Sequence, residues 1–257
     1  MKRITLILIL VSFAYPQNRV VKSFILKYAE NPNATILNGT NQYWTKASSS
    51  VNFERTTAFS IIAVFKPSAG VANQTVISAR GSDATSRGWS LALGSNNLIS
   101  FGIISDLAGS NFINGNTDAG GGAVNTDKLY CVVATYDGSS VNTGLKVYVN
   151  GDSLTLTRTG TMSTTIAGSA PLNIGARNST DRFFGGMISD VQIVSGKALT
   201  AAEAKMISLT YKDGMPPVYE SASIVAWYNW QSGGFDKSGR GNHLTKVNDP
   251  IIVKVKQ

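Results

Sequence analysis

"YVNGDSLTLTRTG" (residues 148–160) places Asn150-Gly151 between two segments in which apolar and polar residues alternate. Both residues of this dipeptide tolerate a positive φ, so it favours the two-residue turn that joins antiparallel strands. The stretch therefore predicts a β-hairpin, and the chain around it carries the same kind of signal.

Short runs of β-branched and aromatic residues, bounded by turn residues, recur along the chain and predict strands. These runs are residues 59–67, 74–81, 88–95, 98–105, 129–138, 170–178, 183–196, 223–230 and 251–256. Residues 108–127 are rich in Gly and Asn and are predicted to form a long loop. A single helix is predicted over 199–208, where Thr200 and Glu203 have the spacing of a capping box. The sequence thus predicts an all-β antiparallel sandwich with one short helix near 200–209.

The composition is that of a globular protein, with 43% hydrophobic and 15% charged residues among 257. The net charge of +8 is spread thinly and does not gather on one element with interleaved aromatics, as in many nucleic-acid binders. We therefore expect no nucleic-acid partner. A solvated basic surface is one interpretation of this charge, and attraction to acidic glycans or a cell envelope is the other. Cys131 lies in an apolar run and is expected to be a buried thiol.

Residues 1–14 resemble a signal peptide, with Lys2 and Arg3, then an apolar run, and small residues at Ser12 and Ala14. Export and removal of this segment is the expectation, and a buried N-terminal strand is the alternative. The run is too short to span a bilayer, and no other apolar segment is long enough, so we expect no transmembrane span.

Four motifs in a fixed order resemble the laminin-G-like branch of the concanavalin A-like jelly rolls. They are "FSIIAVFKP" (59–67), "ATYDG" (134–138), "YVNG" (148–151) and "FFGGMISDV" (183–191), and the match runs from about residue 36 to 209. The tail "DKSGRGNH" (236–243) also resembles the family, in which it commonly opens a domain rather than following one. A tail of this kind resembles laminin-G-like proteins of phage particles and environmental bacteria.

The resemblance implies two antiparallel sheets packed face to face, and a domain organisation with three parts. Residues 1–14 would be the leader, 20–212 the jelly roll, and 213–257 an extension that completes the sandwich or pairs with a neighbouring molecule. Members of the family bind sugars, proteins or calcium, or serve as structural display domains, so the fold alone does not decide the function.

No catalytic residues are assigned. Glycoside hydrolases of this superfamily need opposed carboxylates, in one relevant family as Glu-x-Asp-x-x-Glu, and that pattern is missing from the sequence. A pair from separate strands, such as Asp181 with Asp190, is the remaining hydrolytic alternative. His243 is the only histidine, so a catalytic triad would have to form around the tail. We expect a protein that is not an enzyme.

Sugar binding would use exposed aromatic faces with polar neighbours. The predicted ligand-binding residues are Trp44, Trp89, Phe112, Asn114, Arg182 and Phe183. Packing in the core is the alternative role of each aromatic residue among them. A Ca²⁺ ion would use oxygen ligands in loops, and no other cofactor is expected. The predicted calcium ligands are Asp118, Asn178, Asp181, Asp236 and Asn242. Turn formation is the alternative role of these five residues.

The sequence thus predicts a non-catalytic recognition or adhesion module, with a glycan or cell-envelope polysaccharide as partner, located extracellularly or on the cell surface. The alternative is a structural or decoration protein of a phage particle or other assembly, in which the terminal strands pair with neighbouring copies or other structural proteins.

Overall fold

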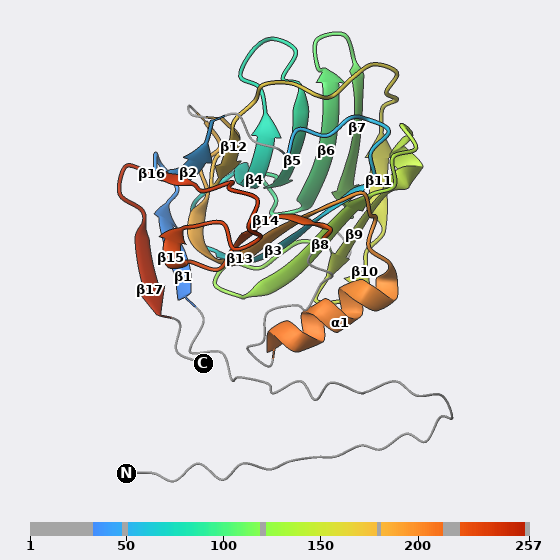
Figure 1. Ribbon diagram of the computed structural model, residues 1–257. Coiled ribbons are helices and arrows are strands. Elements are labelled where there is room, and N and C mark those ends of the chain that lie inside the picture. Colours follow the sequence, from blue (N-terminus) through green and yellow to red (C-terminus); the bar gives the residue numbers. More distant parts are fainter. Residues whose placement is uncertain (1–32, 48–50, 119–121, 179–180, 213–221, 255–257) are drawn as a thin grey trace, which may run out of the picture.

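The computed structural model describes residues 33–47, 51–118, 122–178, 181–212 and 222–254. These residues form two antiparallel β-sheets that pack face to face, with one helix outside them (Figure 1). The predicted jelly-roll class is confirmed. The predicted leader, residues 1–14, lies outside the described residues.

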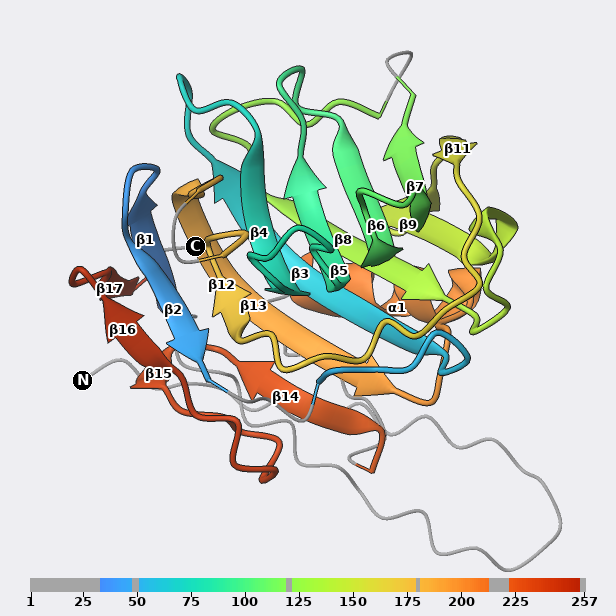
Figure 2. The ribbon, with the colours of Figure 1, turned by 90° about the horizontal axis from the view of Figure 1, so that it is seen from above.

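Sheet A has eight strands in the order β10-β9-β8-β3-β13-β1-β17, and β14 pairs with β13 beside β1. The central strands β3 and β13 are the longest, and they form the floor of the sandwich in Figure 2. The strands are β1 (Asn33–Asn38), β3 (Phe59–Pro67), β8 (Tyr130–Tyr136), β9 (Leu145–Val149), β10 (Asp152–Ser153), β13 (Gly185–Ser195), β14 (Ile224–Tyr228) and β17 (Ile251–Lys254).

Sheet B also has eight strands, in the order β11-β7-β6-β5-β4-β12-β2-β16. They are β2 (Tyr43–Lys46), β4 (Gln74–Arg80), β5 (Gly88–Leu93), β6 (Ile99–Asp106), β7 (Asn111–Thr117), β11 (Leu156–Thr159), β12 (Leu172–Ile174) and β16 (Thr245–Val247). A short strand β15 (Gln231–Gly234) and a 3₁₀ turn (Asn142–Gly144) complete the described elements.

Strand β7 contradicts the prediction of a loop over 108–127. Its residues alternate, with Ile113, Gly115 and Thr117 buried and the intervening Asn114 and Asn116 partly exposed. Asn and Gly are poor strand formers by themselves, so their presence concealed the alternation. Pairing with β6 on one side and β11 on the other overrides this local preference.

The hairpin predicted at Asn150-Gly151 is confirmed, since both residues have a positive φ, of 52° and 87°. It joins β9 to β10, with Val149 opposite Asp152.

The predicted helix is confirmed as α1 (Ala201–Lys212). Its capping box forms, because Thr200 N–H donates to Glu203 Oε2 at 2.8 Å and Glu203 N–H donates to Thr200 Oγ1 at 3.3 Å. The helix covers the outer face of sheet A, where Ala204 and Ile207 pack with apolar residues of β3, β8 and β13. Figure 2 shows α1 on the side of sheet A that faces away from sheet B.

The main core fills the space between the sheets. Phe59, Trp89 and Phe101 lie at its centre, and the ring of Phe59 contacts both other rings with centroids 5.8 and 5.9 Å apart. Such aromatic contacts add to the stabilisation from burial of apolar surface.

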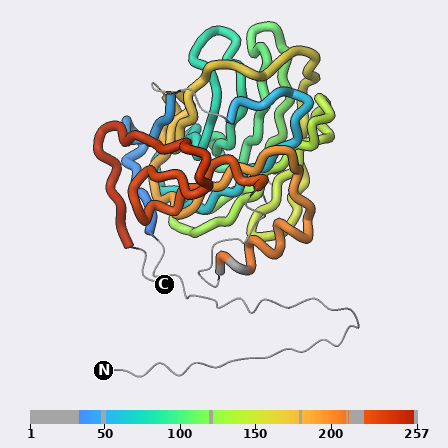
Figure 3. The backbone as a smooth tube through the Cα atoms, viewed as in Figure 1, coloured from blue at the N-terminus to red at the C-terminus, as the bar shows by residue number. Residues whose placement is uncertain are grey.

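The strands after α1 pair with strands of both sheets rather than forming a separate layer. β14 pairs with β13, β16 with β2, and β17 with β1. Figure 3 shows the consequence, since the last described segment runs beside the first. None of the helices in the described ranges reaches the length and hydropathy that a membrane-spanning helix needs.

Candidate ligand-binding surface

The outer face of sheet B carries small polar and charged side chains, whereas apolar side chains that pack against α1 lie on the outer face of sheet A. Core residues such as Ile77, Leu91 and Phe101 alternate along its strands with small polar or charged residues that point to the other side. The outward set is Thr45, Ser78, Arg80, Ser90, Ser100, Asn114 and Asn173. Among the described residues, the helix α1 packs on the outer face of sheet A and not on this polar face.

The described residues 175–178 and 181–184, together named the loop 175–184, lie beside β4. Its neck is held by a hydrogen bond from Phe184 N–H to the Gly175 carbonyl at 2.8 Å. Gly175 turns the chain with a φ of 89°, which favours glycine, and a Cβ there would lie 2.2 Å from Leu37 Cδ1, so that any other residue would require the Leu37 side chain to shift. Thr75 N–H donates to the Arg182 carbonyl at 2.8 Å, which fixes the far part of the loop to β4.

The loop lies over Ser78 on the outer face. The Ser78 hydroxyl is within hydrogen-bond distance of two loop carbonyls, those of Ala176 at 3.0 Å and Arg177 at 2.6 Å. Arg177 in turn binds the carboxylate of Asp181 through two nitrogens, with Nε donating to Oδ1 at 2.9 Å and Nη2 to Oδ2. A paired arginine and carboxylate of this geometry orders the loop.

Arg80 joins this loop from the sheet. Its side chain is on the outer face at the end of β4, nearly buried, and Nε donates to the Ser86 carbonyl at 3.1 Å. Burial, followed by the positive charges of Arg177 and Arg182, lowers the pKa of Arg80 to about 10. Burial and Arg177 also lower the pKa of Arg182. Three guanidinium groups therefore act on one another here, with Asp181 as the carboxylate that offsets them.

Two buried polar atoms beneath the loop lack a hydrogen-bond partner, Thr75 Oγ1 and Asn173 Nδ2. Thr75 and Asn173 lie on the outward-facing positions of β4 and β12 and are almost fully buried. Buried polar atoms without a hydrogen-bond partner are unfavourable for folding, so a ligand group that reached them would offset this cost.

Phe183 supplies the aromatic surface of this site. Its ring is partly exposed and lies 5.9 Å from the ring of Tyr43 on β2. Of the predicted ligand-binding residues, Arg182 and Phe183 thus lie together. Phe112 and Asn114 lie on β7 of the same sheet, three strands from β4, where Asn114 Oδ1 accepts from the Ser100 hydroxyl at 3.1 Å.

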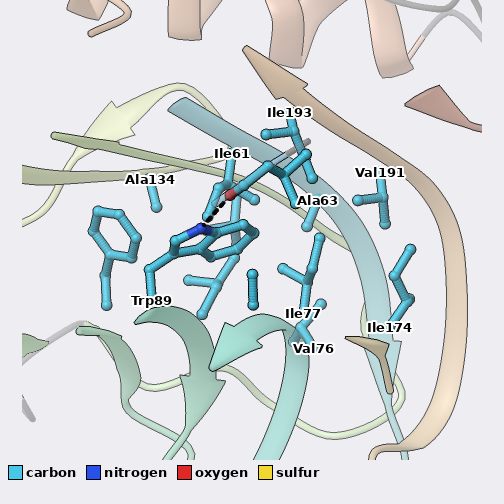
Figure 4. Packing of buried hydrophobic residues seen from close by; sticks show 14 of the residues in the cluster. Ile61, Ala63, Val76, Ile77, Trp89, Ala134, Ile174, Val191 and Ile193 are labelled. Atoms are coloured by element: carbon cyan, nitrogen blue, oxygen red, sulfur yellow. Dashed lines mark hydrogen bonds between the residues drawn. The ribbon is translucent and has the colours of Figure 1, made fainter. Parts of the chain in front are cut away.

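Trp44 and Trp89 were predicted to present exposed rings, and this is wrong. Both indoles point into the core, where Trp44 Nε1 donates to Thr35 Oγ1 and Trp89 Nε1 donates to the Val51 carbonyl, each at 2.9 Å. Figure 4 shows Trp89 enclosed by Ile61, Ile77 and Ala134. A large ring on a strand is most often a core residue, and here each polar N–H finds its partner inside the protein.

The calcium ligands predicted in the tail, Asp236 and Asn242, form a structural turn instead. The buried Asp236 carboxylate accepts from the backbone N–H groups of Trp227, Ser238 and Asn242 at 2.9–3.0 Å, and from the Ser238 hydroxyl at 2.9 Å. Its oxygens are thus occupied by donors, which is the surrounding of a capping carboxylate and does not fit a cation.

The other predicted calcium ligands do not assemble a set of oxygen donors. Asp181 is bound by Arg177, and Asn178 Oδ1 accepts from the Asp181 N–H at 3.2 Å, so positive charge already lies at this place. Asp118 lies at the end of β7 and accepts from the Thr157 hydroxyl at 2.5 Å. The described residues contain no group of three or more His, Cys, Asp or Glu side chains placed to hold a metal ion. Calcium binding stays a prediction that these surroundings do not support.

Asp181 and Asp190, the carboxylate pair of the hydrolytic alternative, do not face each other. Asp181 belongs to the loop on sheet B, whereas Asp190 lies on the outer face of sheet A, where it accepts from Trp227 Nε1 and Gln192 Nε2. The core of the sandwich separates the two faces, so these groups do not flank one glycosidic bond.

Arg80 and Arg177 are the residues of this site that sequence reasoning missed. In the sequence, each of them is a lone arginine that belongs to no recognisable binding motif. The pairing of β4 with β12, which sets Ser78 opposite Asn173, brings them together from positions about a hundred residues apart in the sequence.

Comparison with known proteins agrees with this architecture. A family model described as the concanavalin A-like lectin/glucanases superfamily, in its laminin-G-like form, matches residues 38–205. The sequence matches no curated protein.

Solved structures with the same fold include a candidate carbohydrate-binding protein from Bacteroides ovatus, with a TM-score of 0.61 and 18% identity. That alignment covers 89% of this chain and 61% of the Bacteroides chain, so this chain spans less than two thirds of that protein.

Two further structures are similar over most of their own length. A heptameric SAP-like pentraxin from Limulus polyphemus has a TM-score of 0.54 and 14% identity, covering 86% of this chain and 94% of the pentraxin. The CBM40 domain of the Ruminococcus gnavus IT-sialidase, bound to α2,3-sialyllactose, has a TM-score of 0.51 and 15% identity, covering 68% and 96%.

Proposed function

The chain belongs to the concanavalin A-like lectin/glucanase superfamily, and from this premise we propose that it is a non-catalytic carbohydrate-binding module. Its ligand would lie on the outer face of sheet B, around the loop 175–184. The observation that carries the proposal is the placement of Arg182 and Phe183 on this loop, above a polar sheet face. An aromatic face beside fixed polar groups is the arrangement with which proteins hold sugars.

Two features support the choice of this face over others. Helix α1 covers part of the outer face of sheet A, and the described residues of the loop 175–184 are held at the neck and by the pairing of Arg177 with Asp181. Side chains whose backbone is already held lose less freedom on binding, which favours affinity. The fold carries a sugar in the Ruminococcus gnavus domain, which supports a glycan as the class of ligand.

The context we propose is extracellular, on a cell surface or a virus particle, where polysaccharides are the accessible partners. The net charge of +8 would favour approach to an acidic envelope.

The test is a glycan array probed with the full chain, in buffer with Ca²⁺ and in buffer with EDTA, so that the predicted calcium requirement is measured at the same time. Phe183→Ala is expected to remove binding because it deletes the aromatic surface. Phe235→Ala is the matched control, since Phe235 is 52% exposed and stacks on His243 in the C-terminal turn instead. Absence of binding to any glycan, or equal loss in both variants, contradicts the proposal.

A second candidate function is a structural role in an assembly, favoured by the edge of sheet A. β17 is the last strand of that sheet, and its Ile251 and Ile252 are 60% and 37% exposed. An exposed apolar edge strand can add a strand of another chain. Light scattering after size exclusion should then show oligomers that Ile251→Lys disperses; a monomer at all concentrations would exclude this role for β17.

A further inference from the structure

The charges around the loop 175–184 do not balance. Arg80, Arg177 and Arg182 contribute three positive charges, and Asp181 is the carboxylate that acts on the guanidinium groups of Arg80 and Arg182. The carboxylate of Asp181 already accepts hydrogen bonds from two guanidinium nitrogens of Arg177. Two guanidinium groups, those of Arg80 and Arg182, therefore keep an excess of positive charge at this place.

The two guanidinium groups differ in exposure, which suggests different roles. Arg182 is exposed at the surface of the loop, whereas Arg80 is 7% exposed and held by the Ser86 carbonyl. An anion arriving from solvent would contact the guanidinium group of Arg182, and the buried positive charge of Arg80 would attract it electrostatically. Burial weakens the screening by water, so the field of a buried cation acts more strongly on a nearby ligand.

The backbone at Arg182 supports a functional role independently of charge. Among the described residues, eleven other than glycine have a positive φ, and six of these are Asn or Asp, which tolerate this conformation. Arg182, with a φ of 51°, is one of the five others, of which three are Ser and one is Trp230. A side chain of this size is unfavourable there, and such strain persists where it places a group for function.

We propose that the ligand of this surface is an anionic glycan, one that carries carboxylate or sulfate groups, and that Arg182 binds the charged group directly while Arg80 provides a positive field beneath it. The planar guanidinium of Arg182 matches carboxylate and sulfate oxygens with two parallel N–H donors. The inference rests on the proposed carbohydrate-binding function and names the class of sugar.

Isothermal titration with the full chain tests this with pairs of ligands that differ in charge. Oligogalacturonate is compared with its methyl ester, which is the same chain without the charge, and a sulfated galactan is compared with neutral galactan. These pairs also distinguish the two possible sources of negative charge. Binding of at least one charged ligand is expected, with an affinity about 10-fold or more above that of its neutral partner and falling as NaCl rises from 50 to 300 mM.

The variants separate charge from fold. Arg182→Gln is expected to weaken binding of the charged ligand about 10- to 100-fold, the range for a lost hydrogen bond to a charged group. Arg182→Lys should restore part of it, because the charge returns without the paired donors. Arg158→Gln is the matched control because it removes the same charge at a distant place. Arg158 is exposed and lies on β11, at the far edge of the same sheet.

The outcomes are distinguishable. Equal binding of charged and neutral partners, or an Arg182→Gln variant that binds as the wild type does, overturns the anionic class and leaves the carbohydrate-binding function standing. Binding of none of the four ligands overturns the inference, whereas the proposed carbohydrate-binding function is overturned only by absence of binding on the glycan array. Binding of single-stranded DNA at equal strength, with the same loss in Arg182→Gln, would show a general polyanion site and would also overturn the assignment to a glycan.

Discussion

The indole N–H of Trp227 donates to Asp190 Oδ2 at 3.1 Å, and the amide of Gln192 donates to Oδ1 of the same carboxylate at 3.0 Å. This cluster is buried on the outer face of sheet A. Burial, more than any neighbouring group, raises the pKa of Asp190 to about 7. Asp190 therefore keeps its proton to a higher pH than an exposed aspartate does.

The first prediction concerns pH. An unfolded Asp loses its proton near pH 4, whereas Asp190 in the folded protein keeps it to about pH 7. The folded state binds more protons in this window, so the free energy of unfolding should fall as pH rises from 4 to 7 and level off above. Asp190→Asn should remove this fall and raise stability at pH 8 by roughly 2 to 4 kcal/mol. Urea unfolding at pH 4, 6 and 8 measures it.

Asp249→Asn is the control for this prediction, because Asp249 is exposed and its hydrogen bond and charge pairing with Lys246 lower its pKa. It should leave the decline between pH 4 and 7 in place. An Asp190→Asn variant whose stability follows the wild type at every pH would contradict the buried ionisation.

The second prediction concerns Trp89. Trp89→Phe keeps a ring in the core but removes the hydrogen bond to the Val51 carbonyl, so that a buried acceptor loses its donor. The expected loss of stability is about 1–3 kcal/mol, measured by urea unfolding. Ligand affinity should stay unchanged, since the ring lies between the sheets. Weakened binding without loss of stability would restore Trp89 as a ligand-binding residue.

The third prediction concerns the neck of the loop. Gly175→Ala combines an unfavourable positive φ with a Cβ that meets Leu37, whereas Gly196→Ala has the positive φ, 75°, with nothing within 4 Å. Gly196→Ala should therefore lower stability by about 1 kcal/mol, and Gly175→Ala by about 2 kcal/mol or more. Thermal unfolding of both variants gives the difference. Equal losses would mean that Leu37 moves aside at no cost.

The fourth prediction concerns Arg182 in the absence of ligand. Arg182→Asn places a residue that tolerates a positive φ and removes one of three mutually repelling charges. Stability should rise by a few tenths to about 1 kcal/mol while glycan affinity falls, the pattern of a residue kept for function at the expense of stability. A thermal melt with a parallel binding titration tests both. A variant that is less stable than the wild type would assign Arg182 a structural role.

How far the sequence predicts the structure depends on the range of the interactions. The hairpin at Asn150-Gly151 and the capping box at Thr200 and Glu203 involve residues within a few positions of each other, and both were predicted correctly. Strand β7 was missed because its stability comes from pairing with β6 and β11, which no local propensity reports.

The candidate site shows the same limit. Arg182 and Phe183 could be singled out because a charged and an aromatic residue follow a turn. Arg80 could not, because its relation to the loop arises only when β4 pairs with β12. The burial of Trp44 and Trp89 was likewise undecidable from alternation alone, since the period of two fixes which residues share a face and not which face meets the other sheet.

The pairing of β1 with β17 sets Asn33 opposite Lys254, so the described domain starts and finishes on neighbouring strands. Domains whose ends meet in this way tolerate insertion into a loop of a host protein, and circular permutation, better than domains whose ends lie apart. New termini at the β5–β6 turn, between Gly94 and Leu98, with a short linker joining the old ones, would leave the loop 175–184 untouched. The described domain is thus suited to insertion, as a unit, into a loop of another protein.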